Sequence, residues 1–72
     1  MTLQLENILT QIVRFLKNEL NLKQEHSLAV ISPLKTEHQA QLMMDYLNYN
    51  KDNQYLMKID NILKIALKIS KS

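Results

Sequence analysis

The feature that most constrains this chain is the absence of glycine from all 72 residues. At an average usage of roughly 7%, a chain of this length would carry about five glycines. Glycine provides the positive φ angles and the close backbone approach that phosphate-binding loops and dinucleotide-binding motifs need. Tight β-hairpins also favour glycine, although asparagine can partly replace it. The sequence therefore excludes these nucleotide-binding motifs and argues against a fold built from tight hairpins.

The absence of cysteine removes a second group of functions. Disulfides, thiolate metal sites and cysteine nucleophiles are all excluded. A domain this small has a modest core, so we expect its stability to come from helix packing and self-association. We expect no cofactor and no metal. The longest apolar run is residues 28–31, which predicts neither a signal peptide nor a membrane span and favours the cytoplasm.

Residues 3–20 are predicted to form an amphipathic helix. At 100° per residue the apolar side chains fall in one arc of roughly 160°. Thr2 is a candidate N-cap, and Asn21 is a candidate stop because asparagine tolerates the left-handed conformation that often follows a helix. The arc consists of Leu5, Ile8, Leu9, Ile12, Val13, Phe15, Leu16 and Leu20.

Residues 34–49 are predicted to form the middle helix. Thr36 and Gln39 have the spacing of a capping box, in which each side chain bonds the other's backbone N–H. Apolar residues cover roughly 220° of this helix, which is more than one neighbouring helix can cover. We therefore expect the middle helix to contact two neighbours and still to expose an apolar edge.

Residues 52–69 are predicted to form the last helix, with an apolar arc of roughly 160°. Asp52 suits its N-terminus and the lysines near residue 70 suit its C-terminus. The arc consists of Tyr55, Leu56, Ile59, Ile62, Leu63, Ala66, Leu67 and Ile69.

The connection at residues 21–32 is ambiguous. Its apolar run 28–31 could form a short extended piece or one more helical turn. We treat it as an irregular or short extended connection. The predicted fold is thus a single all-α domain over 1–72, a three-helix bundle with helices near 3–20, 34–49 and 52–69, in which the last two form an antiparallel hairpin.

The function predicted from this pattern is a non-enzymatic protein-interaction module, either a homodimer or a binder of another protein. Methionine and tyrosine are enriched at interfaces, and an apolar helix edge can pack into the groove of a partner. The candidate interface residues are Leu42, Met43, Tyr46 and Tyr49.

The basic second half of the chain suggests two alternatives. Residues 51–72 hold five lysines against two aspartates, a net charge of +3. Such a face could bind nucleic acid or an anionic membrane surface, or it could simply be solvated. A helix–turn–helix is a coarse possibility here, but arginine is absent from this half and Asp52 and Asp60 would face phosphate. The candidate residues for an anionic partner are Lys58, Lys64, Lys68 and Lys71.

Three further polar residues are candidates for a functional site. His26 and His38 each follow a glutamate, but their spacing matches no common metal-ligand motif, so we expect surface histidines. Glu19 falls within the apolar arc of the first helix, where a buried carboxylate would need a partner. We expect instead that the helix frays there and that Glu19 reaches solvent.

Overall fold

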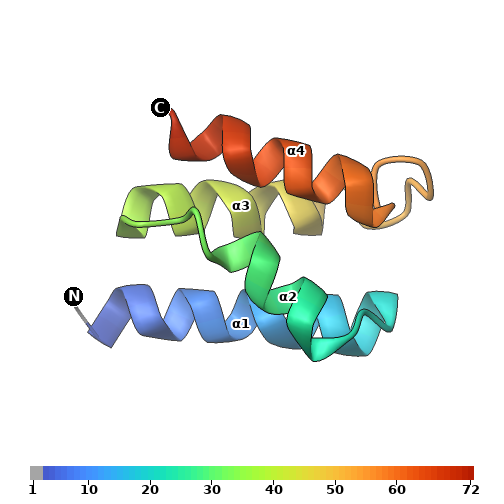
Figure 1. Cartoon of the computed structure of the whole chain (residues 1–72), viewed down its shortest axis with the longest axis horizontal. Coiled ribbons are helices and arrows are strands. Elements are labelled where there is room, and N and C mark those ends of the chain that lie inside the picture. Colours follow the sequence, from blue (N-terminus) through green and yellow to red (C-terminus); the bar gives the residue numbers. More distant parts are fainter. Residues whose placement is uncertain (1–2) are drawn as a thin grey trace.

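The computed structural model describes residues 3–72, which form four helices and no strand. In chain order these are α1 (Leu3–Leu20), α2 (Gln24–Ile31), α3 (Glu37–Asn50) and α4 (Ile59–Ser70). Helices α1 and α3 run in the same direction, and α4 returns antiparallel to α3 (Figure 1). The all-α class is confirmed, whereas the predicted number of three helices is wrong.

Helix α1 has the predicted bounds. Its buried side chains are spaced three and four residues apart, so they form one stripe. Asn21 follows the helix with φ 56°, the left-handed conformation expected of it, and the N–H of Leu22 donates to the carbonyl of Leu16 at 3.0 Å. The predicted N-cap, Thr2, lies outside the described residues. The buried stripe consists of Leu5, Ile8, Ile12 and Leu16.

Helix α2 replaces the irregular or extended connection predicted at residues 21–32. The N–H of Ser27 donates to the carbonyl of Lys23 at 3.0 Å, a helical bond. Ser27 and Val30 are both fully buried and lie one helical turn apart, whereas the adjacent Leu28 and Ala29 are exposed. The apolar residues of this eight-residue helix do not all face inward. The sequence therefore shows no apolar stripe at helical spacing that would have predicted the helix.

Helix α3 begins later than predicted, at Glu37, because Thr36 caps it. The Gln39 N–H donates to Thr36 Oγ1 at 3.1 Å, which confirms half of the predicted capping box. The other half is shifted by one residue, because Gln39 Oε1 accepts from the backbone N–H of Lys35 at 2.8 Å. Gln39 Nε2 also donates to the carbonyl of Ser70 at 3.2 Å, which joins the start of α3 to the end of α4.

Helix α4 begins seven residues later than the predicted start at residue 52. Residues 51–58 instead form turns, in which Asn53 Oδ1 accepts from the N–H of Leu56 at 3.0 Å. Asparagine favours such local bonds over a continuous helix. The turns let Met57 enter the core while Tyr55, which the prediction placed in the apolar arc, is exposed.

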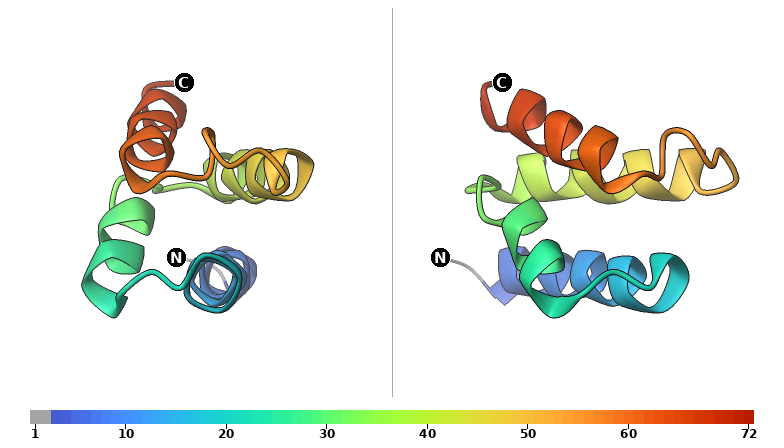
Figure 2. Two further views of the ribbon diagram at one scale, coloured as in Figure 1. Left: turned by 90° about the vertical axis from the view of Figure 1, so that its right-hand side faces the viewer. Right: turned by 45° about the vertical axis from the view of Figure 1, so that its right-hand side comes forward.

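The four helices are arranged as a ring around one core. Helix α1 contacts α2 and α3, and α4 contacts α2 and α3, so the middle helix α3 has the two neighbours that its apolar breadth predicted. The end-on view in Figure 2 shows the helices at the four corners. The buried apolar residues are Leu5, Ile8, Ile12, Leu16, Val30, Leu34, Ala40, Met43, Met44, Leu47, Met57, Ile62 and Ala66.

Candidate protein interface

The outer side of α3 presents large apolar side chains to solvent. Tyr49 is 91% exposed and Leu42 is 37% exposed, and the two lie seven residues apart, or about two helical turns. Tyr46 lies between them on the same side of the helix, one turn from each. We call Leu42, Tyr46 and Tyr49 the α3 edge.

Tyr46 connects the α3 edge to the core. Its side chain is half-buried and packs against the core cluster. Its hydroxyl oxygen is buried and has no hydrogen-bond partner. A buried tyrosine hydroxyl usually has such a partner, so the ring is held here by apolar packing and not by its polar end.

Met43 does not belong to this edge. It was predicted as an interface residue, but it is fully buried, together with Ala40 and Leu47. The wheel placed Met43 in the apolar arc correctly, but it could not tell which part of that arc the neighbouring helices cover. Because α1 and α4 both pack on α3, the covered part is centred on Met43 and the open part on Leu42 and Tyr49.

Polar side chains border the α3 edge. His38 and Asp45 are exposed on the adjoining surface of the helix, about 20–60° further round. Gln41 Nε2 donates to Asp45 Oδ1 at 2.8 Å, one turn along the helix. An apolar centre with a polar rim is the usual composition of a protein interface.

The candidate residues for an anionic partner are all exposed. Lys64 and Lys68 lie within α4, one turn apart, and Lys71 follows the last helical residue. Lys58 directly precedes α4, because the helix starts at Ile59. We call Lys58, Lys64, Lys68 and Lys71 the basic face.

The arrangement of α3 and α4 differs from a helix–turn–helix. The two helices are antiparallel and eight residues of turn separate them, whereas a helix–turn–helix has a short connection.

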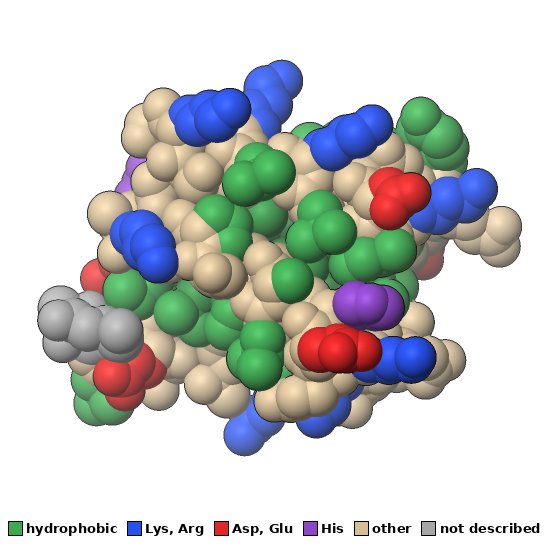
Figure 3. All heavy atoms as spheres, in the orientation of Figure 1, with side chains coloured by type: hydrophobic (Ala, Val, Ile, Leu, Met, Phe, Trp, Pro, Cys, Tyr) green, Lys and Arg blue, Asp and Glu red, His purple; other side chains and the backbone are tan. Residues whose placement is uncertain are grey.

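A second apolar surface was missed by the sequence analysis. Leu28 of α2 is 47% exposed and Leu67 of α4 is 54% exposed. Figure 3 shows hydrophobic side chains gathered over α2 and α4 in the middle of the broad face, with charged groups around them. Leu67 was predicted to lie in the apolar arc of the last helix, and no surface role was predicted for Leu28.

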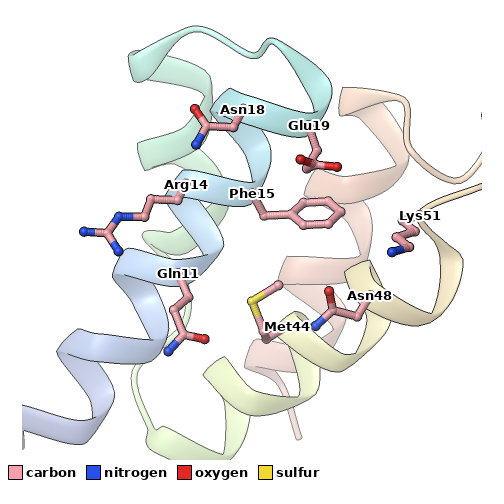
Figure 4. A pocket seen from close by; sticks show the side chains of 8 residues that line it. All are labelled: Gln11, Arg14, Phe15, Asn18, Glu19, Met44, Asn48 and Lys51. Atoms are coloured by element: carbon pink, nitrogen blue, oxygen red, sulfur yellow. The ribbon is translucent and has the colours of Figure 1, made fainter.

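An open groove with a volume of ≈ 470 Å³ lies between α1 and α3. Figure 4 shows Phe15 and Met44 between the two helices, with Glu19 and Lys51 projecting toward the groove from opposite sides and Arg14 pointing away. Glu19 is the one acid among the residues that line it, so the groove offers no carboxylate pair for acid–base catalysis. Gln11, Asn18 and Asn48 complete its lining.

The remaining polar residues lie as the sequence analysis expected, with one correction. His26 and His38 are both exposed. Glu19 is also exposed, but the helix does not fray there, since α1 continues to Leu20 and Glu19 reaches solvent from the groove side. Within residues 3–72 there is no cluster of three His, Asp or Glu side chains that could hold a metal ion. None of the helices in this range is long and apolar enough to cross a bilayer.

Comparison of the chain with protein-family models, with curated proteins and with solved structures gives no match.

Proposed function

We propose that the protein is a non-enzymatic helical interaction module that self-associates through the α3 edge. The observation that carries this proposal is the 91% exposure of Tyr49 on a helix whose opposite side is fully buried. Large aromatic side chains are enriched at the centres of protein interfaces, because they bury much apolar area with little loss of conformational freedom.

The α3 edge resembles a protein interface in the spacing of its side chains as well as in their type. Its three side chains follow one another at four and three residues, the spacing with which a helix presents anchors to the groove of a partner. Tyr46 is fixed by the core, so less side-chain entropy is lost when a partner covers it. The edge is thus partly preorganised for binding.

An energy estimate sets the expected affinity. Full burial of one large apolar side chain contributes about 1.5–3 kcal/mol. A two-fold dimer buries the edge twice, and association itself costs about 4–15 kcal/mol. The net free energy of binding is small because Leu42 and Tyr46 are already partly buried in the monomer. We therefore expect a weak dimer, which forms only toward the high end of a wide concentration series.

The test is the molar mass in solution, measured by sedimentation equilibrium over a wide concentration series. The wild-type chain is expected to change from monomer to dimer across the series, and Tyr49→Ser to raise the dissociation constant by at least roughly tenfold. The matched control is Leu3→Ser, which removes an exposed side chain from the start of α1, outside the edge. A wild-type chain that stays monomeric at every concentration would contradict the proposal, as would a dimer that Tyr49→Ser leaves intact.

A further inference from the structure

The two helices of the C-terminal hairpin carry opposite charges. Helix α3 contains Glu37 and Asp45 and no lysine or arginine, a net charge of −2. Helix α4 and its two flanking residues contain the four lysines of the basic face and Asp60, a net charge of +3. All of these side chains are exposed. The hairpin therefore presents an acidic helix beside a basic one.

The two helices are also direct neighbours. Helices α3 and α4 contact each other and run antiparallel. Gln39 Nε2 at the start of α3 donates to the carbonyl of Ser70 at the end of α4, at 3.2 Å. The boundary between the negative and the positive surface consequently runs along the length of the hairpin. A partner that covers the α3 edge meets both signs of charge at once.

Two arrangements of a second copy are compatible with two-fold symmetry on this hairpin. If the axis is perpendicular to the helices, α3 of one copy faces α3 of the other, and acid meets acid. If the axis is parallel to the helices, α3 of one copy faces α4 of the other, and acid meets lysine at two symmetry-related places. Only the second arrangement has complementary charges, and complementary charges select register and partner orientation.

We propose that the second copy docks with its α4 against α3 of the first, about an axis parallel to the helices, so that Asp45 faces Lys64 and Lys68 of the partner. This inference rests on the proposed self-association and adds its orientation. Asp45 is placed for the role because it borders the α3 edge. Lys64 lies in the middle of α4 and Lys68 lies one turn further on, in the last turn of the helix. The dimer then consists of two stacked layers of two helices, with each acidic helix opposite a basic one.

The test is a charge exchange followed by sedimentation equilibrium. Asp45→Lys alone is expected to weaken the dimer by about tenfold, because one substitution introduces like charges at both symmetry-related contacts. The double variant Lys64→Glu with Lys68→Glu is expected to weaken it similarly. Mixed in equal amounts, the two variants should form a heterodimer of near wild-type affinity, because both of its contacts again join opposite charges.

The control is Glu6→Lys, an equal change of net charge on α1, which should leave the dimer unchanged. The substituted side chains are all exposed, and circular dichroism verifies that each variant folds. A wild-type dimer that Asp45→Lys leaves unchanged, or variants that fail to associate with each other, would overturn the orientation while self-association stands. A wild-type chain that is monomeric throughout would instead overturn the proposed function itself.

Discussion

The two sides of α3 both have apolar side chains, but the inner side faces the core and the outer side faces solvent. Ala40, Met43 and Leu47 on the inner side are fully buried, whereas Leu42 and Tyr49 on the outer side reach solvent. One helix therefore has one apolar surface that its own chain covers and another that it leaves open. The comparison shows that apolar content decides how much surface a helix must hide, while the placement of its neighbours decides which part stays available for binding.

The largest expected effect tests the inner side. Leu47→Ala removes a fully buried side chain from the core side of α3 and leaves a cavity, so the free energy of unfolding should fall by about 2–5 kcal/mol. In a domain of this size such a loss is a large part of the total stability. Chemical denaturation monitored by circular dichroism measures it. A loss below about 1 kcal/mol would show that the inner side is not packed as described.

The second prediction tests the outer side with the same chemical change. Leu42→Ala should lower the free energy of unfolding of the monomer by less than about 1 kcal/mol, because the side chain is already partly in water. It should weaken self-association by about tenfold, since the dimer would bury this side chain twice. Denaturation at low protein concentration separates the two effects. Equal losses of folding stability for Leu42→Ala and Leu47→Ala would remove the distinction between the two sides.

The smallest effect is expected at Tyr46, which lies at the boundary. Tyr46→Phe removes a buried hydroxyl that has no partner, so stability should stay constant or rise by up to about 1 kcal/mol. Thermal unfolding, with Tyr49→Phe as the control for an exposed hydroxyl, measures this. A clear loss of stability would show that the Tyr46 hydroxyl has a bonding partner in solution.

Much of the helical pattern could be predicted from sequence, for a physical reason. Helix α1 has a long and regular apolar stripe that ends at Asn21, so its periodicity and its stop signal agree. Helix α2 has eight residues and two outward apolar side chains, Leu28 and Ala29, so no such stripe is visible. In residues 51–58 the apolar residues continue at helical spacing, which predicted a helix. The chain forms turns there instead, in which Asn53 Oδ1 accepts from the N–H of Leu56.

The candidate interface could be predicted only in part. The breadth of the apolar surface on α3 indicated that an edge would stay open, and the exposure of Leu42 and Tyr49 agrees with that. The assignment of Met43 failed because a helical wheel contains no information about which directions the neighbours occupy. Leu28 and Leu67 were missed for the same reason, since their exposure depends on where α2 crosses the molecule.

The amide of Gln39 has a practical consequence for handling this molecule. It joins the two helices of the hairpin at the end where α4 finishes (Figure 1). Tyr49 is the last residue but one of α3 and lies at the opposite end of that helix. A fluorophore or surface tether attached at Ser72 would lie at the end of the hairpin where Gln39 bonds Ser70. That end is about two helix turns or more away from Tyr49. Labelled molecules could then be immobilised or tracked singly with the attachment kept away from Tyr49.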